Sequence, residues 1–329
     1  MAINLLALEP HKVSRDLSGY ITYIYGEGKT GKTTLATRAG GPLLLAFERG
    51  YNALPGVIAQ DITSWSEVRA VLRELKKPEV KEKFKTIIVD TVDIAGTLCE
   101  KYICAQNDVD KIGDIPYGGG WTLMKKEFEE VFRTMTQLGY AVFFISHCKD
   151  KVFKTEEGIE YNQVIPSCPS SFNNIAKDMA DIYAYAKKYK DKETGTAKVK
   201  LILRSVDNSV DTGSRVKYID PEVPMDYNAL VEALNKAIDV EAKMYDNKYV
   251  TDERNVESVK KELDYDSLIA EFSDITMKLM TKDAPSYGPK ITYIVEKYLG
   301  KGKKVSESSI AQVELIDLIV AEIKDELLK

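Results

Sequence analysis

The chain has 329 residues, of which 44% are apolar, so it is long enough for one large packed domain and a smaller one. Its 46 basic and 51 acidic residues give a net charge of −5, which argues against a protein that covers nucleic acid with its whole surface. We expect any polyanion site to be local.

The N-terminal sequence does not fit a secretion signal, and no apolar run approaches the roughly 18 to 20 residues that span a bilayer. We therefore expect a soluble cytoplasmic protein with no membrane partner, encoded by a phage and acting in its bacterial host. Free thiols are expected at Cys99, Cys104, Cys148 and Cys168. A zinc site built from Cys99, Cys104 and the pair His147–Cys148 is the alternative, although the spacing matches no compact ligand pair.

In its first half the chain alternates strands and helices. The run YITYIY at 20–25 predicts a strand, and TTLATRA after a glycine-rich loop predicts a helix. The pattern continues with a strand at 42–48, a helix at 64–75 opened by Ser64 and Glu67, a strand at 84–93, a helix at 123–139 and a strand at 140–147. This order predicts an α/β fold, with a mostly parallel twisted sheet and helices on both faces.

After residue 147 the pattern changes. Residues 152–165 alternate around Glu157–Gly158 like a hairpin, 170–180 favour a helix, and 181–206 predict two long strands joined near Thr194–Gly195. Such antiparallel additions usually finish one edge of a sheet. A helix capped by Asp226 follows at 225–238.

From about residue 240 the sequence is charged and helix-patterned, with a turn predicted at 283–290 and a glycine-lysine run at 300–304. We therefore expect an ATPase core at 1–239 and a small helical domain at 240–329 that binds a partner or DNA.

Residues 26–33, GEGKTGKT, match the phosphate-binding pattern G-x-x-x-x-G-K-[ST] at every fixed position, between a predicted strand and a predicted helix. In such a loop, main-chain N–H groups and the helix N-terminus surround the β-phosphate, a lysine bridges the β- and γ-phosphates, and a hydroxyl binds Mg²⁺. Lys32 and Thr33 hold these last two positions. ATP and Mg²⁺ are the predicted ligands, with the nucleotide held by Gly26, Glu27, Gly28, Lys29, Thr30, Gly31, Lys32, Thr33 and Thr34.

Bound Mg²⁺ needs a carboxylate near Thr33, and Asp90 ends the apolar strand TIIVD where one is required. The alternative is that Asp90 only caps the following turn. Thr91 comes next, so a carboxylate that activates water must come from another strand. Glu48 ends the strand at 42–48 and is the candidate; the alternative is a surface glutamate paired with Arg49.

His147 ends the strand at 140–147 and is expected at the same edge of the sheet, within reach of the γ-phosphate. A structural imidazole is the alternative. The candidate catalytic residues are therefore Lys32, Glu48 and His147, and the candidate metal ligands are Thr33 and Asp90.

Together, GEGKTGKTT, a strand ending in Glu48, TIIVDTVD and FFISH resemble the ATPase core of the RecA family. More narrowly, FERGYNALPG, PYGGGW and ISHCKDK resemble RecA-like phage ATPases of the single-strand-annealing type, over residues 18–238. The resemblance implies a RecA-like P-loop NTPase core in which Glu48 activates water. The chain differs from RecA in carrying His147 in place of a glutamine and in lacking a long N-terminal oligomerisation helix, which does not favour a RecA-type filament.

The resemblance also implies a homo-oligomer, ring or filament, with ATP between adjacent protomers and loops after residue 147 that line a path for single-stranded DNA. Carried over, these DNA-binding loops begin with Lys149, Lys151, Phe153 and Lys154 and continue toward Phe172 and Lys177. Basic and aromatic side chains suit phosphate contact and base stacking. The alternative for KDKVFK is a solvated hairpin.

Arg204 and Arg215 follow the last strands, where family members can present a basic side chain to the neighbour's ATP. Arg215, in TGSR, is the candidate for that contact, against an ordinary surface arginine. A single-strand-binding protein is a further candidate partner.

The resulting prediction is a Mg-ATP-dependent DNA recombination protein that binds single-stranded DNA and promotes annealing or strand exchange, with slow, DNA-stimulated hydrolysis. The alternative is an ATP-binding switch or loader that acts on a partner protein and binds DNA weakly. A GTPase is not favoured, because the segment NKAI has Ile238 where the base-reading motif N-K-x-D needs an aspartate.

Overall fold

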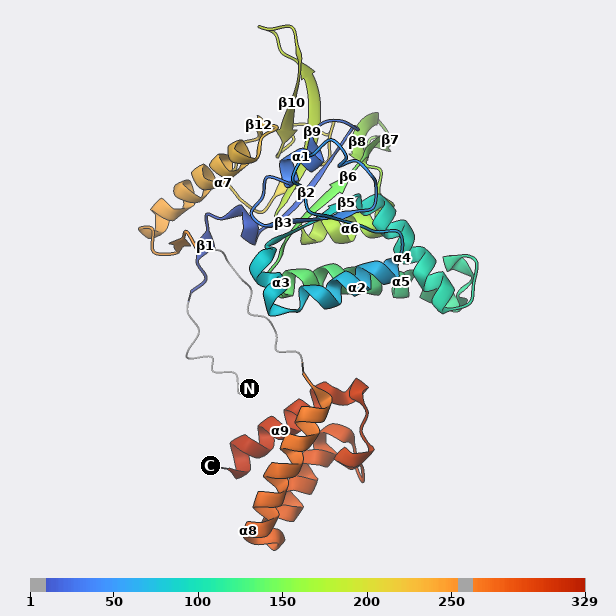
Figure 1. Ribbon diagram of the computed structural model, residues 1–329, viewed down its shortest axis with the longest axis vertical. Helices are drawn as coiled ribbons and strands as arrows, with labels where there is room; N and C mark the ends of the chain where they lie inside the picture. Colours follow the sequence, from blue (N-terminus) through green and yellow to red (C-terminus); the bar gives the residue numbers. More distant parts are fainter. Residues whose placement is uncertain (1–9, 254–262, 329) are drawn as a thin grey trace. The chain divides into compact units, whose positions relative to one another are not determined.

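A mixed β-sheet lies at the centre of the larger part of the chain (Figure 1). The structure is a computed structural model that describes residues 10–253 and 263–328. In spatial order the strands are β12 (Glu222–Pro224), β10 (Ala197–Ile202), β9 (Ile182–Lys190), β2 (Ile21–Gly26), β6 (Ala141–Ser146), β5 (Thr86–Asp90), β3 (Pro42–Ala46) and β4 (Ala59–Asp61). From β9 to β4 all neighbours are parallel, whereas β10, β12 and the short β11 (Gly213–Ser214) are antiparallel. The predicted α/β fold with a mostly parallel sheet is confirmed.

Helices cover both faces of this sheet (Figure 1). One face packs against α1 (Lys32–Ala36) and α7 (Tyr227–Ala242). The other packs against α2 (Trp65–Leu75), α4 (Val92–Gln106), α5 (Gly119–Gln137) and α6 (Ser170–Met179), and α3 (Pro78–Lys83) leads into β5. Because strand residues alternate between faces, Tyr23 and Tyr25 enter one core and Ile24 the other. Strands buried on both sides explain the uninterrupted apolar runs in the sequence.

Most predicted elements of this part occur within a few residues of their expected bounds. The helix start at Ser64 is confirmed, because Ser64 and Glu67 form a reciprocal capping box. The prediction did not include α4, which directly follows β5. The prediction that residues 181–206 form two strands at the edge of the sheet was only partly correct. β10 lies near the edge, next to β12, but β9 lies inside the sheet as a parallel neighbour of β2.

The predicted hairpin after residue 147 is also present. It consists of β7 (Cys148–Lys154) and β8 (Glu160–Pro166), which pair with each other and leave the sheet directly after β6. Elsewhere, β1 (Val13–Ser14) and β13 (Val250–Thr251) pair in parallel and join the two ends of this part of the chain.

The chain divides into two compact units; of the described residues, 11–253 belong to one and 263–328 to the other, which is helical. The boundary predicted at 239–240 falls inside α7 and is therefore too early. In the helical unit, α8 (Tyr265–Leu299) and α9 (Val313–Leu327) share an apolar core that includes Ile294 and Ile316. The turn predicted at 283–290 is a break within α8: Asp283 leaves the helical conformation, and its carboxylate accepts a hydrogen bond from Ser286 N at 3.2 Å.

Candidate nucleotide-binding site

The loop between β2 and α1 has the geometry that its glycines predict. Gly31, the residue before α1, has φ = 88°, a conformation that favours glycine. Gly26 ends β2 opposite Ala186 of β9, and a Cβ at Gly26 would lie 2.8 Å from the Ala186 carbonyl oxygen. Glycine at this position therefore lets β9 approach the start of the loop.

Lys32 lies inside the loop and is 6% exposed. Its Nζ donates hydrogen bonds to the carbonyl oxygens of Gly26 and Glu27, both at 2.8 Å. Burial lowers the pKa of this ammonium, because water no longer stabilises its charge. The bonded acceptors are neutral oxygens, so the charge remains able to attract phosphate, as the predicted role requires.

Thr33 and Asp90 meet across the carboxyl end of the sheet. Thr33 Oγ1 donates a hydrogen bond to Asp90 Oδ2 at 2.6 Å. Asp90 is 9% exposed; burial raises the pKa of its carboxyl group, and the bond from Thr33 partly offsets this. Thr91 rather than Asp90 occupies the N-cap of α4, so the Asp90 carboxylate faces the loop. A hydroxyl and a carboxylate side by side fit the oxygen ligands that Mg²⁺ prefers.

Glu48 follows β3 at the same edge, as predicted. Thr91 Oγ1 donates a hydrogen bond to Glu48 Oε1 at 2.9 Å, and His147 Nε2 lies 3.3 Å from the same oxygen. The Glu48 side chain is 36% exposed, so water can reach it. Glu48 therefore contacts the two neighbouring strand ends, in place of the predicted alternative of an Arg49 pair.

The structure thus brings Lys32, Thr33, Asp90, Glu48 and His147 together at one edge, and their individual roles remain predictions. Sequence reasoning missed Thr91 as a partner of Glu48. A small polar residue directly after Asp90 was the available signal, but its contact with Glu48 depends on how β3 and β5 lie side by side.

The predicted DNA-binding residues lie on β7, which begins directly after His147. Lys149, Lys151 and Lys154 are exposed, and Lys151 Nζ lies 4.8 Å from the centre of the Phe153 ring. Lys154 also pairs with Glu160 at 2.9 Å. At the base of the hairpin, Ser167 N donates to the His147 carbonyl oxygen at 2.9 Å. The hairpin is therefore attached directly to the predicted phosphate sensor.

The predicted continuation of this surface to Phe172 is wrong. Phe172 is 1% exposed and packs in the core against Phe128, with ring centres 4.8 Å apart. Lys177, in the same helix, is paired with Asp211 at 2.6 Å. A buried aromatic ring cannot stack on a nucleobase unless the core opens.

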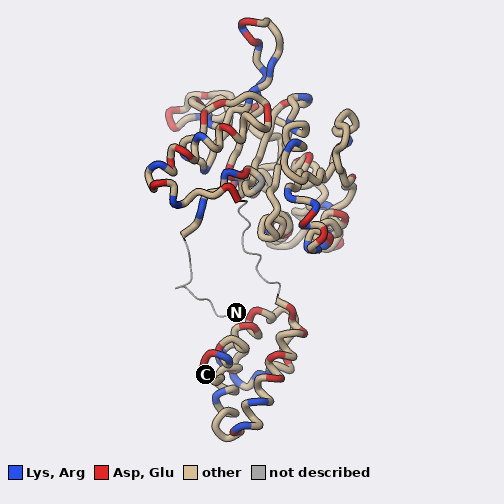
Figure 2. The backbone as a smooth tube through the Cα atoms, turned by 60° about the vertical axis from the view of Figure 1, so that its left-hand side comes forward, with Lys and Arg blue, Asp and Glu red and all other residues tan. Residues whose placement is uncertain are grey.

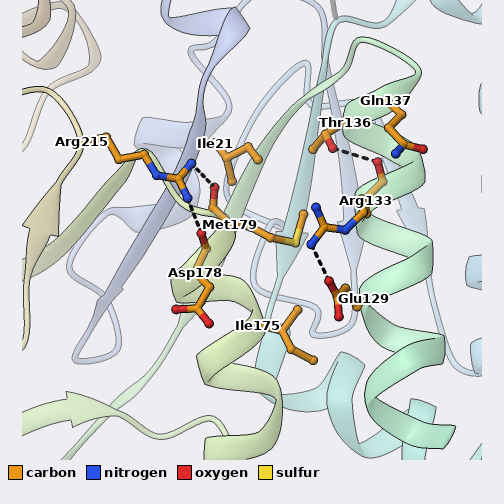
Figure 3. A pocket seen from close by; sticks show the side chains of 9 residues that line it. All are labelled: Ile21, Glu129, Arg133, Thr136, Gln137, Ile175, Asp178, Met179 and Arg215. Atoms are coloured by element: carbon orange, nitrogen blue, oxygen red, sulfur yellow. Dashed lines mark hydrogen bonds and ion pairs between the residues drawn. The ribbon is translucent and has the colours of Figure 1, made fainter. Parts of the chain in front are cut away.

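Arg215 lies at the opposite end of the sheet from the phosphate loop, near Ile21 at the start of β2 (Figure 3). It lines a cavity of about 310 Å³ and donates to the carbonyl oxygens of Met179 and Asp178. Its guanidinium also pairs with Asp181 at 3.0 Å. Arg215 therefore does not reach the loop of its own chain, and a contact with a neighbouring copy remains a prediction. Arg204 is held by the carbonyl oxygens of Ser214 and Val216.

All cysteines are free thiols, as predicted. Within residues 10–253 and 263–328, no group of three or more His, Cys, Asp or Glu side chains could hold a metal ion, so the zinc alternative has no support. In the same described ranges, no helix has both the length and the apolar character needed to cross a bilayer.

A protein-family model described as "AAA domain" matches residues 18–224. The chain belongs to this family. With its complete phosphate-binding loop, this AAA domain is a P-loop NTPase, a class that binds a nucleoside triphosphate, usually with Mg²⁺.

The chain is also similar to the SPbeta prophage-derived uncharacterized protein YorG of Bacillus subtilis (strain 168). The two are 31% identical over 336 residues, covering 99% of each chain. Among solved structures, the KaiC-like protein PH0186 from Pyrococcus horikoshii OT3 matches 65% of this chain and 94% of its own, with 10% identity and a TM-score of 0.36.

Proposed function

We propose that this protein hydrolyses ATP in the presence of Mg²⁺, with Glu48 as the base that activates water. The observation that carries the proposal is the convergence of Lys32, the Thr33–Asp90 pair and Glu48 at one edge of the sheet. Bound Mg²⁺ would neutralise charge on the transferred phosphoryl group. The chain itself supplies an ammonium inside the loop and an accessible carboxylate that can accept a proton from water.

The arrangement of Glu48 suits this role. Thr91 donates to Oε1, which fixes the carboxylate, and His147 Nε2 lies 3.3 Å from Oε1 and 3.5 Å from Oε2. The imidazole can therefore orient the carboxylate and reach a phosphate oxygen at the same edge. Glu48 is on a different strand from Asp90, so the same carboxylate need not serve both metal and water.

A cavity beside the loop supports a nucleotide as the ligand. It has a volume of about 630 Å³ and is lined by Thr30, Gly31 and Thr34 of the loop region and by Tyr189 and Tyr227. A nucleoside attached to phosphates in the loop can enter it, and aromatic side chains offer stacking surfaces.

We further propose that the protein binds single-stranded DNA through the β7–β8 hairpin and acts in phage DNA recombination, as a homo-oligomer with ATP at the subunit interface. Exposed lysines and Phe153 on β7, and the 2.9 Å bond between Ser167 and His147, support this proposal. The prophage relative supports a phage origin. DNA on the hairpin would then stimulate hydrolysis through His147.

Phosphate release by Glu48→Gln tests the hydrolysis step. Glutamine retains an oxygen that can accept the Thr91 hydrogen bond but cannot take a proton, so turnover should fall by about 10²- to 10⁴-fold. Binding of a fluorescent ATP analogue should change little, whereas Lys32→Ala should lose binding as well. Unchanged turnover in Glu48→Gln would show that the base lies elsewhere.

Anisotropy of a labelled oligonucleotide, measured over a range of salt concentrations, tests the DNA-binding step. Replacing the three hairpin lysines by glutamine should weaken binding and reduce the slope of log K against log salt by roughly 0.7 for each phosphate that the hairpin no longer binds. The matched control replaces three lysines that precede β5 at the other end of the sheet: Lys76, Lys77 and Lys83. Equal losses in both triple variants would refute the hairpin assignment, and no DNA binding by the native protein would favour a protein partner.

A further inference from the structure

The phosphate-binding loop contains a carboxylate. Glu27 is the second residue of GEGKTGKT, and its carbonyl oxygen accepts hydrogen bonds from Lys32 Nζ at 2.8 Å and Thr30 Oγ1 at 2.9 Å. Glu27 is therefore part of the structure that holds Lys32. A negative side chain at this point repels a triphosphate, unless another charge neutralises it.

Lys188 supplies that charge. Its Nζ lies 2.7 Å from Glu27 Oε2, and both side chains are about half-exposed. The register explains the contact: Gly26 is opposite Ala186, and Lys188 lies two residues further along β9, on the same face of the strand. Gly26 has no Cβ to keep β9 away.

The pair also joins the loop to a distinct element. Residues Ile182–Ala186 of β9 are buried, whereas 187–190 are exposed, so β9 leaves the sheet where Lys188 begins to contact Glu27. Beyond this point β9 and β10 form an arm that projects past the sheet and carries several basic segments (Figure 2).

We propose that Lys188 is a positioning residue of the nucleotide site: it neutralises Glu27, holds its carboxylate against β9, and thereby sets the affinity of the loop for a nucleoside triphosphate. This inference rests on the proposed nucleotide binding. Lys188 acts through Glu27 and not by contact with phosphate, so its removal matters only while the Glu27 charge is present.

A double-mutant cycle on the full chain tests this. The readout is the dissociation constant of a fluorescent, non-hydrolysable ATP analogue with Mg²⁺ at low salt. Lys188→Met should weaken binding about two- to fivefold, the upper part of the range expected for an exposed charge pair. Glu27→Gln should bind at least as tightly as the native protein, and Glu27→Gln with Lys188→Met should restore native affinity. The effect of Lys188→Met should shrink as salt increases.

The matched control is Lys190→Met, which removes the same charge two residues further along β9. It should leave the dissociation constant unchanged. A double variant as weak as Lys188→Met would mean that Lys188 contacts the nucleotide directly, and an equal loss in Lys190→Met would mean that only the overall charge of the arm matters. Either result, or an unchanged constant in Lys188→Met, overturns the inference. A native protein that binds no analogue would instead refute the proposed function.

Discussion

Asp90→Asn should stabilise the protein without nucleotide and remove its response to Mg-nucleotide. Asp90 is 9% exposed, and burial raises the pKa of its carboxyl group, with nearby Glu48 adding to the effect and the Thr33 hydrogen bond opposing it. The folded protein therefore holds the charged form of Asp90 less well than the unfolded chain does. Asparagine removes the charge and keeps an oxygen that can accept the bond from Thr33.

The sign of the pH dependence follows from linkage. The folded-state pKa lies above the unfolded one, so between these values the folded protein binds more protons, and the free energy of unfolding falls as pH rises through this window. Above it, at neutral pH, the full cost is present. Removing such a cost at a functional site should add on the order of 1 kcal/mol. For a unit of this size that raises the thermal midpoint by about 2–4 °C. The gain should disappear below the ordinary aspartate pKa, where Asp90 is neutral in both states.

With Mg-nucleotide bound, the native protein should become more stable than Asp90→Asn. A ligand at 100 times its dissociation constant stabilises the native state by about 2.7 kcal/mol. The native protein should gain most of this with Mg-ATP analogue, and Asp90→Asn should gain much less because it lacks the carboxylate that we propose binds Mg²⁺. Thermal midpoints by circular dichroism, with and without ligand at neutral and acidic pH, measure both effects.

Asp191→Asn is the control with the opposite sign. Hydrogen bonds from Lys198 and Thr194 lower the pKa of the Asp191 carboxyl group, so its charge stabilises the folded state at neutral pH and the stabilisation is lost as pH falls through the lowered pKa. Asp191→Asn should therefore lower the midpoint slightly and leave the ligand response intact. If Asp90→Asn is less stable than the native protein without nucleotide, the hydrogen bonding of the Asp90 carboxylate outweighs the cost of burying its charge, and the reasoning fails.

Two further substitutions test the core. Phe172→Ala removes a ring that packs on Phe128 and should cost about 3–5 kcal/mol, seen as a large fall in the thermal midpoint; weaker DNA binding at unchanged stability would instead restore Phe172 to the DNA path. Glu127→Ala removes the acceptor of Trp65 Nε1 and Arg69 Nε, at 2.6 and 2.7 Å, and should cost roughly 3 kcal/mol in denaturant unfolding. Arg133→Ala, which removes an exposed charged side chain from the same helix, is the control. An equal loss of unfolding free energy in that variant would argue against a special role for the buried Glu127 carboxylate.

The sequence predicts best where local pattern decides the structure. β2, β5 and β6 are apolar runs between loops, and fixed spacing identifies the phosphate loop. Helix α4 was missed because its apolar residues are not confined to one stripe: Val92, Ala95, Cys99 and Ile103 lie along one face and are buried, whereas Leu98 lies off that face and is also partly buried. Phe172 was wrongly assigned to the DNA-binding surface because an aromatic residue next to polar ones occurs both in core helices and in nucleic-acid-binding loops, and the local sequence does not distinguish them.

Contacts set by strand register could not be predicted from local pattern. Glu48 and Thr91 meet because β3 and β5 are parallel neighbours, and Glu27 meets Lys188 because β9 enters the sheet beside β2. The expected position of residues 181–206, as two antiparallel strands at the edge of the sheet, does not bring Lys188 close to the phosphate-binding loop. Because β9 was not expected beside β2, the contact between Glu27 and Lys188 could not be predicted.

The two buried charged groups of the site, Lys32 and Asp90, have opposite charges, and their pKa values shift in opposite directions. Burial lowers the pKa of Lys32 and raises that of Asp90, so each shift favours the neutral form of the group. Lys32 is bonded to carbonyl oxygens and Asp90 to a hydroxyl, so neither charge is directly bonded to an opposite one. A bound phosphate would supply the negative charge that Lys32 lacks as a partner, and a bound metal ion would supply the positive charge that Asp90 lacks. The free energy of unfolding should therefore depend strongly on the nucleotide. The contacts of Glu48 with Thr91 and His147 join this edge of the sheet to the hairpin that begins at Cys148.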